Sequence, residues 1–248
     1  MSKWDEMACL AFDLETSGVS PLEDRIVTAA LVEVHPGKGR PQTTSYVVDP
    51  GIDIPAEAAA VHGYTRERAI AEATHSIDQA LFEIAGRIAL WLGHGRPLVV
   101  MNAAFDVTFL EVECRRHGVD GLIARLGHPS KVAPVIDPFV LDKHADPYRK
   151  GGRRLEQLCA TYGVRHTGAH AAAGDALATA RLWPRIIAAH PGKFKGQTLG
   201  GLHAAQTGWR RDQCNSLREY FDRKGTPHDG VDPSWPFHSA LTSTGVPA

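Results

Sequence analysis

The chain has 248 residues, of which 43% are hydrophobic and 22% are charged, so it can bury a substantial core. Its formal net charge of −1 excludes the strongly basic composition with which some proteins attract nucleic acid over their whole surface. The first residues do not resemble a secretory signal, and no apolar run could cross a bilayer. We therefore expect a cytoplasmic protein with no membrane partner.

Charge is unevenly distributed along the chain. Residues 1–145 contain 13 Lys and Arg against 20 Asp and Glu, whereas residues 146–248 contain 14 against 8. An acidic region needs metal ions before it tolerates phosphate, and a basic region attracts a phosphodiester backbone. The densest basic cluster consists of Arg149, Lys150, Arg153 and Arg154. We interpret this cluster as the solvent-exposed start of a helix. The alternative is that these residues attract a phosphodiester backbone.

The expected elements begin with strands and continue with strands that alternate with helices. Three strands are expected first, at residues 7–13, 25–35 and 43–49. Helices at 65–73 and 76–92 follow, the second on apolar residues at helical spacing. The remaining elements are strands at 97–101 and 134–137 and helices at 103–117, 153–162 and 171–189. Pro184 should kink the last helix or end it early.

This order predicts an α/β fold with a mixed five-stranded sheet flanked by helices. Beyond residue 190 we expect an amphipathic helix at 202–223 and then an irregular segment rich in Gly, Pro, Ser and Asp. Its aromatic residues are too numerous for a purely solvated linker, so part of it should pack on the preceding domain or on a partner. They are Trp209, Tyr220, Phe221, Trp235 and Phe237.

The first segment with chemical potential follows the apolar run at residues 7–12, where Asp13 and Glu15 appear. Residues i and i+2 of a strand point to the same side, so both carboxylates face one point. Their like charges repel unless a cation lies between them. The small residues 16–18 would let a substrate approach the backbone closely. Two solvent-facing acids at a strand end are the alternative interpretation.

A second apolar run, at residues 97–101, is followed by Asn102 and Asp106. Asp106 is expected in the first turn of a helix, facing back over the strand end, although the helix dipole also favours acids there. Asn102 fits an ordinary helix cap. Phe105 fits either the core or an aromatic side chain that stacks on a base.

A third segment, HAAAGDALATA at residues 170–180, reads as an alanine-rich helix. His170 would lie on the loop or first turn that leads into it, and Asp175 about a turn later. A lone histidine is usually a surface residue. Beside a metal-binding carboxylate it becomes a candidate general base, because its ordinary pKa lies near neutral pH.

Together, the three segments resemble the motifs of the DEDD superfamily of 3′–5′ exonucleases, in the DnaQ-like DEDDh subgroup that uses a histidine base. The subgroup includes the proofreading epsilon-type subunits of bacterial DNA polymerase III, RNase T and oligoribonuclease. The matching segments are FDLETSG, NAAFDVTFL and HAAAGDALATA, and flanking matches begin at Ala60, Val135 and Leu155. The resemblance implies a ribonuclease H-like exonuclease domain at residues 1–190 and leaves residues 191–248 as a C-terminal extension.

The resemblance also implies a catalytic apparatus. Four carboxylates would hold two Mg²⁺ or Mn²⁺ ions, metals that prefer hard oxygen ligands. His170 would take a proton from the attacking water, and the product would be a nucleoside 5′-monophosphate. The four carboxylates are those of Asp13, Glu15, Asp106 and Asp175, and no catalytic position is missing.

Four further residues are expected near the terminal nucleotide by the same resemblance: Thr16, His62, Asn102 and Phe105. The backbone N–H of Thr16 could meet the 3′-OH. His62 could contact the nucleotide or belong to a structural turn. Tyr64 stands where the family often has isoleucine, which leaves the role of that position open.

The remaining acids and cysteines are expected to be structural. We expect Asp137 to have a strand-end or hydrogen-bonding role, and Asp142 and Asp146 to lie on the surface. The four cysteines are far apart and match no zinc spacing. Cys9 and Cys159 lie in apolar patterns and are expected to be buried, reduced thiols.

The leading functional interpretation is a 3′–5′ exonuclease that acts on single-stranded or frayed 3′ ends, DNA in preference to RNA, and that could serve a DNA polymerase as a proofreading subunit. The nearest alternative is an exoribonuclease of the RNase T or oligoribonuclease kind. Those enzymes usually lack such an extension, and no residue here shows how a 2′-OH would be sensed. A non-catalytic nucleic-acid-binding scaffold is a third interpretation, and it would require the loss of a carboxylate or of His170.

Overall fold

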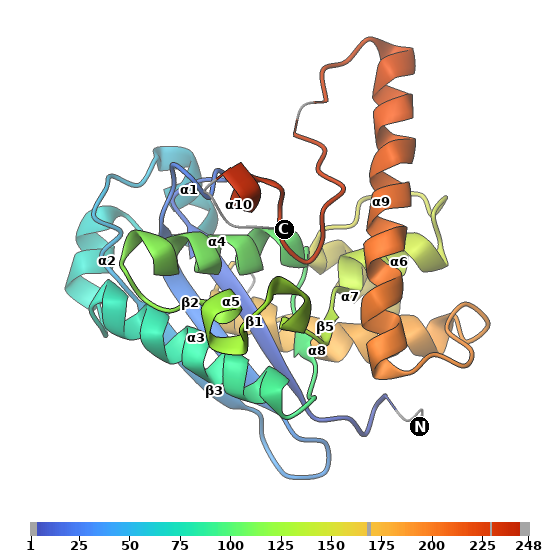
Figure 1. Ribbon diagram of the computed structural model, residues 1–248, viewed down its shortest axis with the longest axis horizontal. Coiled ribbons are helices and arrows are strands. Elements are labelled where there is room, and N and C mark those ends of the chain that lie inside the picture. The colour runs from blue at the N-terminus through green and yellow to red at the C-terminus, as the bar shows by residue number, and fades with distance from the viewer. Residues whose placement is uncertain (1–3, 168–169, 229, 244–248) are drawn as a thin grey trace.

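The computed structural model describes residues 4–167, 170–228 and 230–243, with side chains up to residue 241. Its centre is a mixed five-stranded sheet with the order β3-β2-β1-β4-β5 (Figure 1). β1 pairs antiparallel with β2 and parallel with β4, and β5 continues the parallel half. The strands are β1 (Cys9–Thr16), β2 (Ile26–Val34), β3 (Gln42–Val47), β4 (Leu98–Val99) and β5 (Val135–Ile136). The α/β fold predicted from the sequence is confirmed.

Helices cover both faces of this sheet (Figure 1). One core layer lies between the sheet and helices α3, α4 and α5, and the other lies between the sheet and α6, α7 and α8. In chain order, the helices before β5 are α1 (Ala56–His62), α2 (Arg66–Glu72), α3 (Ile77–Gly93), α4 (Ala103–Arg116) and α5 (Leu122–Leu126). Those that follow are α6 (Pro138–Ala145), α7 (Leu155–Tyr162), α8 (Ala172–Ala189), α9 (Leu199–Lys224) and α10 (Ala240–Ser243), and one 3₁₀ turn, η1 (Pro129–Lys131), precedes β5.

The alternation of side chains along β1 decides which layer the catalytic candidates meet. Leu10, Phe12 and Leu14 belong to the layer with α3 and α4, whereas Cys9 and Ala11 belong to the layer with α8. Residues two apart in a strand share a face. Asp13 and Glu15 therefore continue the face that α8 covers.

Five short elements and the effect of one proline differ from what the sequence predicts. Helices α1, α5, α6 and α10 and the turn η1 are not predicted, because each is too short to show helical periodicity clearly. Helix α8 continues through Pro184 to Ala189, so the expectation of an early end is wrong. Pro184 and its neighbours Trp183 and Ile186 are buried, and tertiary packing sustains the helix beyond the lost hydrogen bond.

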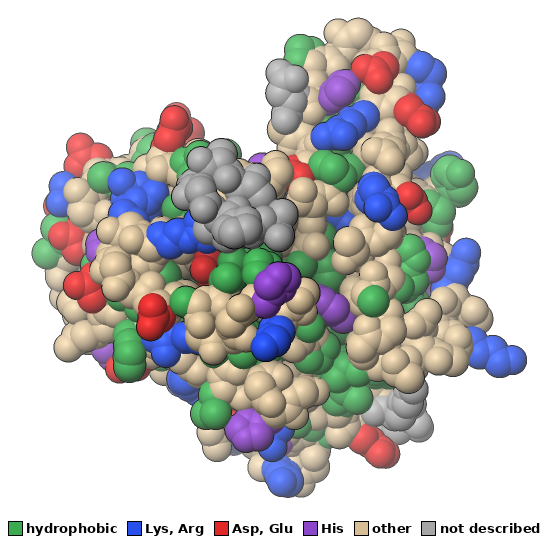
Figure 2. All heavy atoms as spheres, viewed as in Figure 1, with side chains coloured by type: hydrophobic (Ala, Val, Ile, Leu, Met, Phe, Trp, Pro, Cys, Tyr) green, Lys and Arg blue, Asp and Glu red, His purple; other side chains and the backbone are tan. Residues whose placement is uncertain are grey.

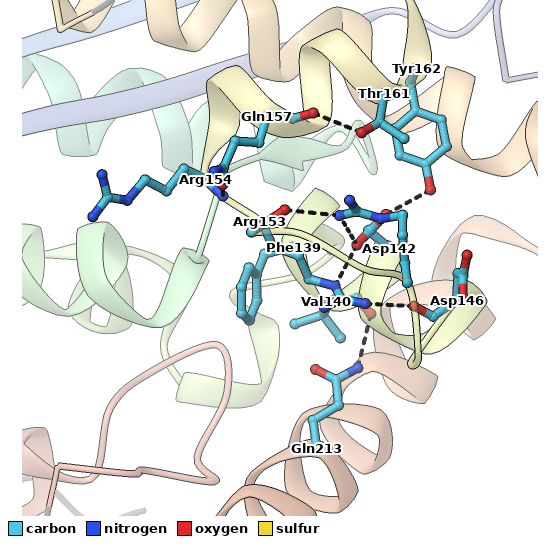
Figure 3. A network of polar contacts seen from close by, with 12 residues as sticks. Phe139, Val140, Asp142, Asp146, Arg153, Arg154, Gln157, Thr161, Tyr162 and Gln213 are labelled. Carbon is cyan, nitrogen blue, oxygen red and sulfur yellow. Dashed lines mark hydrogen bonds and ion pairs between the residues drawn. The ribbon is translucent and has the colours of Figure 1, made fainter.

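Asp142 is buried, contrary to the expectation that it lies on the surface. Its side chain is 0% exposed, and Figure 3 shows it inside a network formed by α6, α7 and the loop between them. Arg153 donates to Oδ2 at 2.7 Å, Arg149 donates to the same oxygen at 3.2 Å, and the Tyr162 hydroxyl donates to Oδ1 at 2.7 Å. Half of the basic cluster is thus committed to one carboxylate, and its interpretation as a solvated helix start is wrong for Arg149 and Arg153. The backbone N–H of Asp146 caps α6.

The extension after residue 190 consists of α9 and a segment that returns toward the sheet (Figure 1). The base of α9 packs against α6 and β5, and its other end projects from the body of the molecule. Trp235 and Leu241 of the return are buried, so the expectation that aromatic residues pack back is confirmed for Trp235. Figure 2 shows acidic and basic side chains mixed over the projecting part. Among the described residues, no helix has both the length and the apolar character that a membrane crossing requires.

Candidate active site

The parallel half of the sheet gathers the candidate residues at one edge. β1, β4 and β5 run in the same direction, so their C-terminal ends meet there. Asp13 and Glu15 lie in the second half of β1, Asn102 follows β4, and Asp137 follows β5 directly. The N-terminal part of α8 brings Asp175 to the same place from the covering layer.

Three of the four predicted metal ligands form a compact cluster. Asp13, Glu15 and Asp175 each offer one carboxylate oxygen, and these oxygens lie within 4.8 Å of one another. All three side chains are partly buried. The structure thus brings together residues separated by about 160 positions in the sequence. Such a set of oxygens is suited to a hard divalent cation.

Asp106 lies beside the cluster and is held differently. It is 4% exposed, in the first turn of α4, as expected. The backbone N–H of Leu14 donates to its Oδ1 at 3.0 Å, which ties α4 to the strand between Asp13 and Glu15. Its oxygens are not part of the compact triplet, yet its charge raises the pKa of Asp13. One oxygen of Asp106 is therefore used for positioning.

The electrostatics of these carboxylates fit a metal site. Burial, and then the charges of Asp106, Asp175 and Glu15, raise the pKa of Asp13. Burial and the charge of Asp175 raise the pKa of Glu15 to about 7. Burial likewise raises the pKa of Asp106, although the N–H of Leu14 opposes the rise. None of these influences comes from a lysine or arginine of the described chain. A bound cation would supply the missing positive charge.

A cavity of about 230 Å³ adjoins the cluster and contains both predicted histidines. Glu15, His62 and His170 line it, together with Tyr64 and Arg68. His170 is exposed and has a φ of 62°, in the left-handed region that a non-glycine residue adopts only under local constraint. It occupies the loop before α8, as the sequence predicted.

His62 contributes to the wall of this cavity and holds a buried nitrogen without a hydrogen-bond partner among the described protein atoms. Its ring is 8% exposed, and its Nδ1 accepts the backbone N–H of Tyr64 at 3.2 Å. The neutral ring then carries its hydrogen on Nε2, which is buried and has no hydrogen-bond partner among the described protein atoms. The Thr16 backbone approaches the ring without completing such a bond. Burial lowers the pKa of His62, which favours this neutral form.

The other predicted substrate residues occupy the rim of the same edge. Thr16 ends β1, and its hydroxyl donates to the carbonyl of Gly18 at 2.6 Å. Asn102 stands at the N-cap of α4 with a φ of 56°, but its exposed side chain makes no capping bond, so its expected capping role is wrong. Phe105 is partly buried, and its ring packs on that of Phe109 with centroids 4.7 Å apart.

Comparison with known proteins identifies the family. The family model of the RNase T type, described as an exonuclease, matches residues 10–183, which include all four carboxylates and His170. The chain belongs to this exonuclease family. The resemblance to DnaQ-like DEDD exonucleases is therefore confirmed, and the family is one of metal-dependent nucleases.

Curated relatives of this exonuclease are much longer proteins. A DNA polymerase III subunit epsilon-like protein of Rhodobacter capsulatus is 31% identical over 201 residues, which are 79% of this chain and 26% of the relative. A PolC-type DNA polymerase III of Lacticaseibacillus paracasei is 29% identical over 173 residues, or 70% of this chain and 11% of the relative. The chain thus spans about a quarter and about a tenth of these two proteins.

Solved structures of Exonuclease I share the fold of this exonuclease. The Escherichia coli enzyme in complex with a dA16 oligonucleotide superposes with a TM-score of 0.61 at 18% identity, covering 86% of this chain and 45% of that chain. Exonuclease I from Methylocaldum szegediense gives a TM-score of 0.57 at 18% identity, covering 86% and 46%. At such low identity the likeness establishes the fold alone.

Two residues of the exonuclease site were not assigned to it from the sequence. His166 Nε2 lies 2.6 Å from Asp175 Oδ1, and both side chains are largely buried. His166 stands four residues before His170 in the sequence, and this spacing could have indicated that it belongs to the site. Asp137 received a hydrogen-bonding role in prediction, but its link to the loop of Asn102 was not foreseen, because that link depends on the order of the strands.

Proposed function

We propose that this exonuclease removes nucleotides one at a time from single-stranded or frayed 3′ ends of DNA and releases nucleoside 5′-monophosphates, in the manner of a proofreading epsilon subunit. Two divalent ions, Mg²⁺ or Mn²⁺, would assist the hydrolysis. The observation that carries the proposal is the approach of three carboxylate oxygens to within 4.8 Å, beside a cavity that two histidines line.

The carboxylates and His170 have separate roles in the proposed reaction. Asp13, Glu15 and Asp175 would hold the ions, and Asp106 would contribute the oxygen that does not accept from Leu14. Bound ions would acidify the attacking water and neutralise charge on the phosphate. His170, exposed at the cavity, accepts the proton of that water.

The terminal nucleotide is proposed to occupy the rim formed by Thr16, His62, Asn102 and Phe105. His62 lines the cavity, and a small rotation of its ring on binding would let the buried Nε2–H, which has no partner among the described protein atoms, donate to an acceptor on the nucleotide. The exposed side chain of Asn102 and the partly buried ring of Phe105, at the start of α4, would contact the same nucleotide. These groups would orient the scissile phosphate before any chemistry occurs.

Two of the comparisons support DNA as the substrate. One relative is an epsilon-like protein of a DNA polymerase, and one structural neighbour was solved with a DNA oligonucleotide. The same epsilon-like relative supports a polymerase as the partner. The RNA alternative belongs to the same family and differs only in how the sugar is recognised.

The decisive test compares equal sequences of DNA and RNA that carry a 5′ label. We expect Mg²⁺-dependent shortening from the 3′ end, single nucleoside 5′-monophosphates as products, and faster digestion of DNA. A duplex with mismatched terminal bases should be digested faster than a fully paired one, because fraying supplies the single strand. Faster digestion of RNA than of DNA would overturn the proofreading proposal and support the exoribonuclease alternative.

The scaffold alternative is tested by His170→Ala and Asp13→Ala beside the unchanged chain. We expect both variants to lose hydrolysis by orders of magnitude while retaining the fold, as checked by circular dichroism. A matched control is His75→Ala, which changes a histidine on the loop before α3. If the unchanged chain bound oligonucleotides in Mg²⁺ but cut none of them, the scaffold alternative would hold.

A further inference from the structure

The C-terminal extension meets the catalytic edge at one buried carboxylate, that of Asp137. The side chain is 1% exposed. Its Oδ1 accepts the backbone N–H groups of Asn102 and Phe139, and its Oδ2 accepts that of Ala103, all at 2.9 Å. One carboxylate therefore satisfies the first N–H groups of both α4 and α6, and the side chain of Asn102 at the N-cap of α4 makes no such bond.

Two residues of the extension hold Asp137 in place. Gln206 on α9 is 0% exposed; its Oε1 accepts the backbone N–H of Asp137 at 2.8 Å, and its Nε2 donates to the carbonyl of Val135 at 3.0 Å. Trp235 on the returning segment donates its Nε1–H to Asp137 Oδ2 at 3.4 Å. The indole is 7% exposed and belongs to the core layer that contains α4.

A third contact joins the returning segment to α4 itself. The backbone N–H of His238 donates to Oγ1 of Thr108 at 2.8 Å. Thr108 is 0% exposed and lies two residues after Asp106. The extension thus bonds directly to α4 after Asp106, and it reaches the start of α4 through Asp137.

The turn that carries Asp106 needs such support. Asn102 has a φ of 56°, a left-handed conformation that an L-residue adopts at a cost, and its own side chain does not cap the helix. Asp137 supplies the bonds that keep this turn in place. Outer residues of this kind commonly set the affinity of a metal site.

We propose that the extension positions the metal site. Gln206 and Trp235 fix Asp137, Asp137 fixes the turn from which Asp106 projects, and the backbone of His238 holds the same helix at Thr108. The inference rests on the proposed function in one respect, that Asp106 belongs to the metal-binding set. It goes beyond that function because it makes the segment after residue 190 a working part of the catalytic edge. Asp137, Gln206 and Trp235 are positioning residues, since they act through Asp106.

The test uses Mn²⁺ binding to the full chain, measured by electron paramagnetic resonance of the free ion. Trp235→Phe removes one N–H and keeps the aromatic packing. The matched control is Trp91→Phe: Trp91 is also 7% exposed and also donates its Nε1–H, here to the carbonyl of Pro97 at 3.0 Å. Pro97 precedes β4, at the opposite edge of the sheet from the carboxylates.

We expect Trp235→Phe to weaken Mn²⁺ binding by roughly tenfold, whereas Trp91→Phe leaves it unchanged even if both lower the melting temperature equally. In the nuclease assay, Trp235→Phe should lower kcat more than it changes KM. A purely structural role would lower stability without changing metal affinity. Wild-type Mn²⁺ affinity in Trp235→Phe, or an equal loss in Trp91→Phe, would overturn the inference.

A second variant keeps the test decisive if Trp235→Phe does not fold. Thr108→Val removes the acceptor of His238 without changing the shape of the side chain, and we expect about threefold weaker Mn²⁺ binding. Unchanged affinity in Thr108→Val would then overturn the inference. If the wild type binds Mn²⁺ but cuts neither DNA nor RNA, the proposed function fails while the comparison of variants still decides the positioning role.

Discussion

Acidic side chains in two regions of this molecule have opposite surroundings: Asp142 beside α7, and Asp13 and Glu15 on β1. Asp142 receives two guanidinium groups and a phenol from its own chain (Figure 3). Burial, and then the charges of neighbouring carboxylates, raise the pKa of both Asp13 and Glu15. Since a buried charge is costly without a partner, Asp142 is fully paired within the protein, whereas Asp13 and Glu15 are suited to a cation from solution. The comparison separates a structural acid from the acids proposed to be catalytic on electrostatic grounds.

The largest expected effect is on the rate of hydrolysis, and it concerns the carboxylates that lack a positive partner in the described chain, those of Asp13 and Glu15. Asp13→Asn should lower the rate of hydrolysis by ~10³-fold, about 4 kcal/mol in the barrier, because a metal ligand is lost. The same change should preserve or raise the melting temperature without metal, because one of several repelling charges disappears. Rates on a labelled oligonucleotide and calorimetry in a chelator provide the two measurements. A variant that loses stability together with activity would contradict the assignment.

The same Asp-to-Asn change at the fully paired Asp142 should lower the stability of the protein rather than its activity. Asp142→Asn should lower the free energy of unfolding by about 3–5 kcal/mol, since Arg149 and Arg153 would lose their partner while remaining largely buried. Urea denaturation measures the loss. Mn²⁺ affinity of the folded variant should equal that of the wild type.

The control for this prediction is Asp146→Asn, four residues away on the same segment. Asp146 contributes its backbone to the network, through its N–H to Asp142 and its carbonyl to Arg153, and the substitution keeps that backbone. Its effect should stay within about 0.5 kcal/mol. Equal losses in the two variants would show that the pairing of Asp142 is not the source of stability.

Adjacent arginines offer a finer comparison within the network. Arg153→Ala should cost about 2 kcal/mol, because its Nε bonds to a buried carboxylate. Arg154→Ala should change stability by no more than about 0.5 kcal/mol, because Figure 3 shows its side chain pointing away from the network and it is exposed. Thermal melts of the two variants under one condition test the difference. If Arg154→Ala lost more stability than Arg153→Ala, the network around Asp142 would contribute little to the free energy of unfolding.

The smallest expected effect is a pH dependence of the metal-free protein. The pKa of Glu15 rises from 4.5 to about 7 on folding, so between these values the folded state holds a proton that the unfolded state has lost. Stability from this group is therefore complete below pH 4.5 and is lost as the pH rises to about 7.

The matching measurement is the melting temperature in a chelator over that pH range. It should fall by a few degrees, and less in Glu15→Gln, which cannot lose a proton. Added Mn²⁺ should reverse the fall, because metal binds the deprotonated carboxylates. If the melting temperatures of the wild type and Glu15→Gln fell equally as the pH rises, the raised pKa assigned to Glu15 would be refuted.

The sequence was sufficient to predict the strands and helices whose hydrophobic residues recur at a regular spacing. The apolar run before Asp13 and the helical spacing of α3 predicted elements that the structure contains. Helix α1 was missed because its alanine-rich turn and its proline N-cap carry almost no periodic signal. Pro184 was misjudged because the packing that sustains α8 comes from residues far away in the chain.

At the site, the sequence could indicate which residue types matter but not how they are held. Asp13, Glu15 and Asp175 are brought together as the strand alternation and the resemblance suggested, and their roles stay predictions. The burial of Asp142 could not be read locally, because its partners come from α7 and the preceding loop. The role of Asp137 likewise depends on which strands are neighbours, a property of the tertiary structure.

The four thiols have a practical consequence for observing this protein at work. All are buried and unpaired, and burial raises the pKa of Cys9 and Cys114 to about 12 and that of Cys159 to about 11. Thiolates react with maleimides far faster than thiols do. A single cysteine introduced on the projecting end of α9, for example by Tyr220→Cys at a site 48% exposed, would therefore accept a dye selectively. Fluorescence from that position could then report when a strand or another protein arrives.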